Sequence, residues 1–228
     1  MSAAAIVASA TACGSFSSEE GSSVDGSTPD TSIVESGARE AATESDTAPP
    51  EAGVDTGAAR HLRVFVLTTP WSILNTHLGD GGTMAGRNAA DLFCADEASA
   101  AGLGSSFRAW MSSNEGDAID RLPNDADWSL PVAGAAAQLV FPSRSSMDQG
   151  QPPLQPLSRG ASGIPLTDAE SRVWTGTSAM GRATGVDCTN WTVFGTGTAG
   201  RTGTVSSSWT NAGPASCDAK LHVFCFGY

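Results

Sequence analysis

The fold is decided by the last fourteen residues, 215–228, which read ASCDAKLHVFCFGY. Leu221, Val223 and Cys225 occupy alternate positions, so they share one face of a predicted strand that closes the chain. Two of the chain's five cysteines lie in this stretch. The cysteines that we expect to form two disulfides are Cys94, Cys188, Cys217 and Cys225. Because disulfides persist only in oxidising compartments, this part of the chain is predicted to be extracytoplasmic.

The spacing of these cysteines leaves their pairing open, because four cysteines permit three pairings. A bond between Cys94 and Cys225 would join the first predicted helix to the last strand. A bond between Cys188 and Cys217 would close a region rich in Gly, Thr and Ser. Composition alone does not choose among the pairings.

Residues 61–228 are predicted to form one domain, since 168 residues suffice for a single hydrophobic core. Few helices, many short strands and long loops indicate an α+β domain with irregular loops. The predicted helix is Arg87–Leu103, in which apolar residues recur at helical spacing. The predicted strands are Leu62–Thr69, Phe107–Ser112, Gln138–Phe141, Val173–Thr177 and Leu221–Tyr228.

The fifth cysteine, Cys13, follows a short run of small and apolar residues, MSAAAIVASATA at 1–12. Such a run is typical of the end of a secretory signal, and Ala10–Ala12 before Cys13 resembles a loose bacterial lipobox. We therefore interpret residues 1–13 as a truncated signal with a lipobox, and Cys13 as the site of lipidation. The alternative is a cleaved signal in which Cys13 has no role.

Residues 14–60 have a different composition, with ten acidic residues, two basic residues and few large apolar ones. Such a segment cannot bury enough apolar surface to offset the entropy lost on ordering. It is predicted to be a disordered, acidic tether. A coil scale of about 5–6 Å times the square root of its length would hold the domain several nanometres from a membrane.

The charge of the chain indicates which partners to exclude. Of the net charge of −12, the tether carries −8 and residues 61–228 carry −4, with Lys220 as the only lysine. Nucleic acids, heparin-like polyanions and anionic lipid surfaces all require clustered basic charge, so none of them is an expected partner. Membrane contact is expected only through a lipid anchor.

Six short motifs occur in a fixed order along the predicted domain. They are AGLGSSFRAWMSS at 101–113, LVFPS at 139–143, RVWTGT at 172–177, CTNW at 188–191, ASC at 215–217 and VFC at 223–225. In the same order they resemble AVGLAGTFRAFLSS, LLFPS, SVWHGS, CETW, ASC and VLC of endostatin, the C-terminal domain of collagens XV and XVIII. The resemblance spans nearly all of residues 61–228.

This resemblance implies a compact variant of the C-type-lectin-like fold. It also implies a nested pairing, with Cys94–Cys225 as the outer disulfide and Cys188–Cys217 as the inner one. Together with the lipobox, it suggests a bacterial surface lipoprotein that carries an endostatin-like domain.

The chain departs from endostatin at the positions that carry known ligands of that family. Arg63 and Ala137 stand where the family's zinc ligands are, so no metal site is expected. Asn114 and Asp127 stand where its heparin-binding surface is basic. The calcium signature of C-type lectins has no match, so neither calcium-dependent sugar binding nor a cofactor is expected.

Three further patterns do not support a chemical site. Gly195–Gly200 (GTGTAG) fits a dinucleotide fingerprint but no helix former follows it, so it predicts a flexible loop. Asn124–Asp127 (NDAD) lacks the Gly and the terminal Glu of a calcium loop, so it predicts a solvated turn. His61, His77 and His222 lie far apart in the sequence and there is no GxSxG elbow, so no catalytic residue is expected.

Three of the six tryptophans are better candidates for ligand contact than these three patterns. Trp71, Trp128 and Trp209 lie in or beside predicted loops, near Asn, Asp and Ser residues. An exposed indole in such surroundings suits stacking on a sugar or contact with a protein partner. The alternative is that each one anchors its loop from a partly buried position.

These features indicate a non-catalytic binding or adhesion lipoprotein at the outer membrane or cell surface, or a secreted protein. Its expected partner is a glycan, a matrix component or a protein. A structural envelope protein without a specific ligand is the second hypothesis. A secreted hydrolase is the third.

The assignment of Cys13 leads to a direct prediction. Because acyl chains would anchor the protein, mass spectrometry of the mature protein should find its first residue to be Cys13 with added lipid mass. An unmodified N-terminus elsewhere would contradict lipidation.

Overall fold

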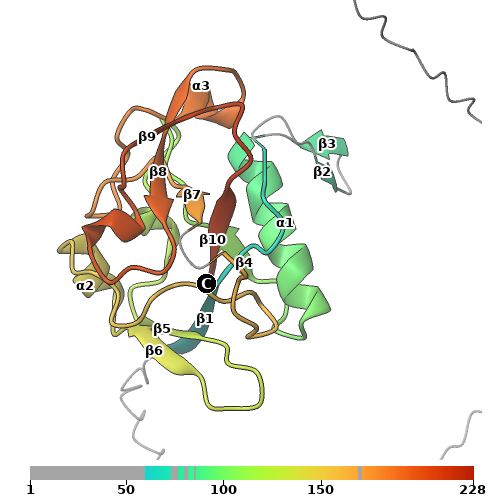
Figure 1. Ribbon diagram of the computed structural model, residues 1–228, viewed down its shortest axis with the longest axis vertical. Coiled ribbons are helices and arrows are strands. Elements are labelled where there is room, and N and C mark those ends of the chain that lie inside the picture. The colour runs from blue at the N-terminus through green and yellow to red at the C-terminus, as the bar shows by residue number, and fades with distance from the viewer. Residues whose placement is uncertain (1–59, 73–76, 80–81, 85, 169–170) are drawn as a thin grey trace, which may run out of the picture. The chain divides into compact units, whose positions relative to one another are not determined.

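The structure of the chain is a computed structural model, which describes residues 60–72, 77–79, 82–84, 86–168 and 171–228 (Figure 1). The predicted lipobox with Cys13 and the predicted tether up to residue 59 lie outside the described residues. Within the described ranges, every helix is too short or too polar to cross a lipid bilayer.

One mixed sheet organises the domain (Figure 1). Its strands, from one edge to the other, are β6 (Gln138–Phe141), β5 (Ala126–Leu130), β1 (Arg60–Val66), β10 (His222–Gly227), β7 (Arg172–Trp174), β8 (Thr196–Arg201) and β9 (Pro214–Ser216). A further strand, β4 (Phe107–Ala109), pairs with β10. The first strand of the sheet, β1, pairs antiparallel with the last, β10, and parallel with β5.

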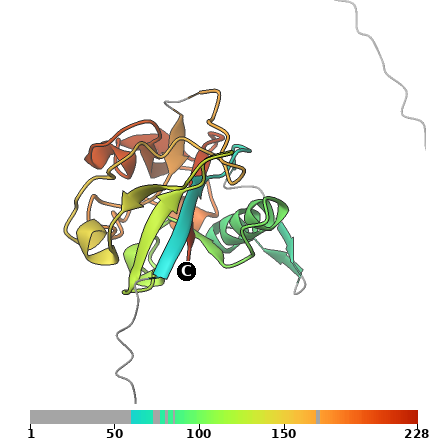
Figure 2. The same ribbon diagram turned by 90° about the horizontal axis from the view of Figure 1, so that it is seen from below.

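The helix α1 (Gly86–Ala100) lies along one flank of this sheet, with the hairpin of β2 (His77–Gly79) and β3 (Gly82–Met84) beside it (Figures 1 and 2). The remaining helical elements are short. They are η1 (Ile119–Arg121), α2 (Arg144–Asp148), α3 (Cys188–Trp191) and η2 (Ser207–Trp209).

The two faces of the sheet bury two separate hydrophobic clusters. Successive side chains of a strand point to opposite faces, and β10 supplies Val223 and Cys225 to one cluster and Phe224 and Phe226 to the other. On the first face the cluster is covered by small residues of α1, which are Ala90, Cys94 and Ala98. On the second face it is filled by aromatic rings, which include Trp110, Trp128, Phe141 and Trp209.

Two disulfides connect these elements. Cys94 in α1 is bonded to Cys225 in β10, and Cys188 is bonded to Cys217, just after β9. This is the nested pairing that the endostatin resemblance implied. From the sequence separations of 131 and 29 residues, the chain-entropy model gives about 5 and about 4 kcal/mol of stabilisation.

Four of the predicted elements agree closely with the structure. The helix and the strands at 62–69, 138–141 and 221–228 are present with small shifts of their ends. The domain is a mixed sheet with few helices, richer in strands than the α+β prediction. Gly195–Gly200 is not a flexible loop, because 196–201 is β8. Asn124–Asp127 is not only a turn, because β5 begins at Ala126.

The glycines of β8 are required by packing. A Cβ atom at Gly200 would lie 2.0 Å from the backbone oxygen of Trp209, and one at Gly197 would lie 2.7 Å from Sγ of Cys188. A strand with side chains at these positions could not approach η2 and the inner disulfide as closely. The Gly-rich pattern therefore reflects close contact and not flexibility.

Gly200→Ala should lower the free energy of unfolding by about 3 kcal/mol or more, at the upper end of the cost of overpacking. Gly227→Ala is the matched control in the same sheet, since its closest contact would be 3.2 Å from the backbone oxygen of Arg63, and should cost about 1 kcal/mol. Urea denaturation measures both. Equal losses would contradict this account of β8.

Candidate functional site

The three tryptophans proposed for ligand contact are buried. Trp71, Trp128 and Trp209 are 1%, 0% and 1% exposed. Trp128 donates from Nε1 to the backbone oxygen of Gly227 at 3.0 Å, so even its polar atom is satisfied inside the protein. The ring of Trp209 lies 5.0 Å from that of Phe141, centroid to centroid. The expectation that these side chains are exposed to a ligand is therefore wrong, since burial of the large indole surface outweighs any solvent contact.

A polar concavity elsewhere is the best candidate for a site. It has a volume of about 260 Å³, and we call it the Arg87 pocket. Its lining residues come from the start of α1, the loop after β4 and the segment around α3, and are Arg87, Asn88, Glu115, Thr189, Asn190 and Thr192. They are charged or neutral polar, with no large apolar side chain among them. Such a lining offers hydrogen-bond donors and acceptors to a small polar ligand.

One wall of the pocket is a left-handed turn. Cys188, Thr189, Asn190 and Trp191 have φ angles of 55°, 51°, 58° and 63°. For residues other than glycine this conformation costs roughly 1–2 kcal/mol each. Such strain persists only where the surrounding structure imposes it, and it is typical of functional sites.

Three contacts hold this turn in its strained conformation. Cys188 is fixed by its disulfide to Cys217. Trp191 is fully buried and donates from Nε1 to the backbone oxygen of Ser112 at 3.0 Å. The Asp187 side chain caps the turn by accepting from the backbone N–H of Asn190 at 3.2 Å.

The turn also meets the start of α1. Gly86 has a φ of +63°, and a Cβ atom there would lie 2.9 Å from the backbone oxygen of Asn190. Only glycine allows both this angle and this approach. The contact brings Arg87 and Asn88, the next two residues, to the edge of the turn.

The loop after β4 forms the third side. The backbone N–H of Asn114 donates to Oδ1 of Asn190 at 3.1 Å and to Oδ2 of Asp187 at 3.3 Å. Ser113 and Gly116 close a tight turn with two backbone hydrogen bonds of 3.1 Å. The backbone around Glu115 is thereby tied to the left-handed turn.

Arg87 is the charged group at the centre of this arrangement. Its side chain is 13% exposed, and it donates from Nη1 to the backbone oxygen of Gly116 at 3.2 Å and from Nη2 to Oε2 of Glu115 at 3.0 Å. Its Nε is buried and makes no hydrogen bond. A buried donor without a partner is costly, so one N–H group of this guanidinium remains unsatisfied.

A partly buried ion pair fixes α1 one turn after Arg87. Arg121 of η1 donates to the carboxylate of Asp91 in α1, which also accepts from the backbone N–H of Ala109 at 2.8 Å. Burial raises the pKa of Asp91 and lowers that of Arg121, although each opposes the shift of the other. The pair ties α1, η1 and β4 together next to the pocket.

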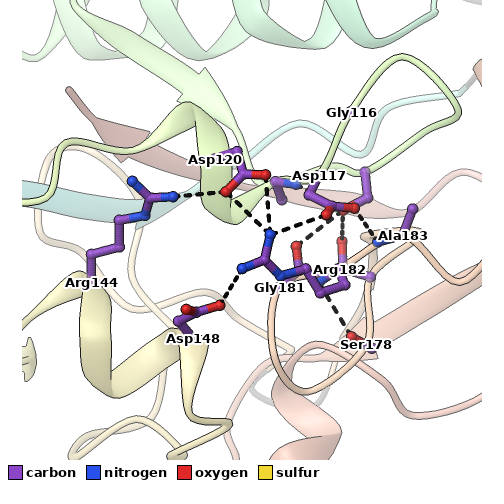
Figure 3. Close-up of polar contacts among 12 residues, drawn as sticks. Gly116, Asp117, Asp120, Arg144, Asp148, Ser178, Gly181, Arg182 and Ala183 are labelled. Atoms are coloured by element: carbon purple, nitrogen blue, oxygen red, sulfur yellow. Dashed lines mark hydrogen bonds and ion pairs between the residues drawn. The ribbon is translucent and has the colours of Figure 1, made fainter.

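A second charged group lies around Arg182 (Figure 3). Its guanidinium lies between the carboxylates of Asp117, Asp120 and Asp148, at distances of 3.3, 3.1 and 2.6 Å. Hydrogen bonds to Asp148 and Asp117 raise the pKa of Arg182. Because one guanidinium already engages all three carboxylates, we interpret this network as a structural connection between η1, α2 and the loop before α3.

The described residues contain no group of three or more His, Cys, Asp or Glu side chains that could hold a metal ion. His61 and His222 are engaged singly. His61 lies 2.7 Å from Oδ2 of Asp127, and His222 lies 2.7 Å from the backbone oxygen of Leu67. These two histidines therefore do not come together at a common site.

No protein-family model and no curated protein matches this sequence.

Sequence reasoning did not identify the Arg87 pocket as a site. Its residues are spread from 87 to 192 and are common surface types, so no spacing connects them. The one local signal is the CTNW motif at 188–191, which forms the left-handed turn.

The Arg182 network predicts a salt-dependent loss of stability. Arg182→Met should lower the urea midpoint at low salt, because Asp117, Asp120 and Asp148 then repel one another with only Arg144 left, 2.7 Å from Asp120, as a cation. This loss should shrink in 1 M NaCl, where the screening length is about 3 Å. Arg172→Met is the control, since Arg172 donates to the backbone oxygens of Gly213 and Pro214. Its loss should not depend on salt. An equal loss at both salt concentrations for Arg182→Met would contradict the repulsion.

Proposed function

We propose that this chain is a non-catalytic binding module, held at the cell surface by a lipid on Cys13, with the Arg87 pocket as its ligand site. The observation that carries the proposal is the pocket itself. It combines a mostly buried arginine with an unused donor and a strained turn of four residues. Maintaining such a turn is costly, and presenting a rigid polar surface to a ligand accounts for that cost.

The two disulfides indicate an extracytoplasmic protein. The lipid anchor and the outer surface of the cell are part of the proposal, and the lipobox-like sequence before Cys13 supports them.

The fold is proposed to be a compact, endostatin-like variant of the C-type-lectin-like fold. Six collinear motifs support this, and the mixed sheet with its nested disulfides is compatible with it. The binding surface is proposed to differ from those of that family, because the residues that would hold zinc or heparin are replaced by Arg63, Ala137, Asn114 and Asp127.

Screening tests the proposal with the full chain, carrying Cys13→Ser so that it stays in solution. It should bind members of a glycan array or of a panel of extracellular proteins. Arg87→Met should lose at least 90% of that binding, because it removes the central donor. Lys220→Met is the control, since it also removes one positive charge but from an exposed position outside the pocket lining. Binding that survives Arg87→Met, or turnover of a polymer without binding, would contradict the proposal.

A further inference from the structure

We infer that the Arg87 pocket binds the carboxylate of an acidic monosaccharide unit, such as a hexuronic acid, and that this carboxylate replaces Glu115 on Arg87. The inference rests on the proposed binding function and adds the chemical class of the ligand.

The geometry of the Arg87 guanidinium favours a carboxylate as ligand. Nε and Nη2 of an arginine lie on one edge, and their two N–H groups match the two oxygens of a carboxylate. In Arg87 only half of this edge is used. Glu115 reaches Nη2 with one oxygen at 3.0 Å, while the buried Nε has no partner. A carboxylate seated on both donors would satisfy the group that Glu115 leaves unpaired, and this requires that rotation of the Glu115 side chain also uncovers the buried Nε.

The side chain of Glu115 can move away from Arg87. Its side chain is 58% exposed, against 13% for Arg87, and no other hydrogen bond of its carboxylate is found among the described residues. Its backbone is held separately, since its N–H donates to Oγ of Ser113 at 3.2 Å. The carboxylate of this ion pair faces solvent, while the guanidinium is mostly buried. A side-chain rotation is therefore enough to open the edge of Arg87, with no change of fold.

The remaining lining residues favour a sugar over a peptide. Asn88, Thr189, Asn190 and Thr192 offer amides and hydroxyls, which pair with sugar hydroxyl groups. Asn190 already uses Oδ1 to accept from Asn114, which fixes its amide in place. A peptide ligand would bring side chains that need apolar contact, and the pocket lining offers no large apolar side chain.

The size and the charge of the Arg87 pocket favour a single sugar unit with one carboxylate. A volume of about 260 Å³ is below the roughly 300–1,000 Å³ typical of pockets for drug-sized molecules, so it suits one sugar unit. The lining holds a single cation, Arg87, in a domain of net charge −4. One carboxylate is thus favoured over a densely charged polyanion.

Titration of the Cys13→Ser chain with glucuronate and galacturonate tests the inference, with glucose and the peptide acetyl-Gly-Gly as matched probes. The Arg87 Nε–H resonance in ¹⁵N-labelled protein reports the contact directly. A uronate should bind at least tenfold more tightly than glucose or the peptide and should shift this resonance.

Two variants separate the carboxylate contact from general stability. Arg87→Lys keeps the charge but loses the two-donor edge, and should weaken uronate binding at least tenfold. Glu115→Gln removes the competing carboxylate from an exposed position, and should strengthen uronate binding severalfold without affecting the fold. Weaker uronate binding by Glu115→Gln would overturn the displacement of Glu115.

The remaining outcomes distinguish failure of this inference from failure of the proposed function. Equal binding of glucose and a uronate, or tighter binding of the peptide, would overturn the acidic-sugar assignment. If array ligands depend on Arg87 but no uronate binds, the inference fails while the proposed binding function stands. If no array ligand and no uronate binds, both fail.

Discussion

The structure depends on the covalent and hydrogen-bonded position of its last segment, 217–227. The strand β10 pairs with β1, β4 and β7 and places alternate side chains in both hydrophobic clusters. The same segment carries Cys217 and Cys225, whose bonds run to the left-handed turn and to α1. The C-terminal segment therefore joins the two cores and is bonded to two of the three elements that line the Arg87 pocket.

This arrangement explains how a small domain can maintain a strained site. Four consecutive left-handed residues would relax if the turn were free. The inner disulfide, the buried Trp191 and the cap from Asp187 hold it, and the outer disulfide with the Asp91–Arg121 pair holds α1 opposite. The stability of the cores is thus used to fix polar groups that face solvent. A rigid pocket loses little entropy when it binds, which favours recognition of a small ligand.

The sequence predicted those parts of the fold that have a local pattern. The strand at the C-terminus follows from alternating apolar residues, and α1 follows from its helical spacing. It could not predict β8, because Gly197 and Gly200 look like loop residues until the rings and backbone that they approach are known. Polar neighbours made Trp128 and Trp209 candidates for ligand contact, with loop anchoring as the alternative, whereas their actual partners come from distant strands. The sequence could not predict the Arg87 pocket for the same reason, since Arg87, Glu115 and Asn190 meet only through the tertiary fold.

Native-state hydrogen exchange of the Cys188→Ala, Cys217→Ala double variant tests most directly whether the C-terminal segment maintains the site. The amides of Trp191 and Thr192 bond within the turn, to the backbone oxygens of Asp187 and Cys188 at 2.7 and 3.2 Å. Without the inner disulfide these amides should exchange by local opening, while the amides of β10 still exchange only on global unfolding. Protection of the turn that stays as high, relative to β10, as in the parent protein would contradict the account.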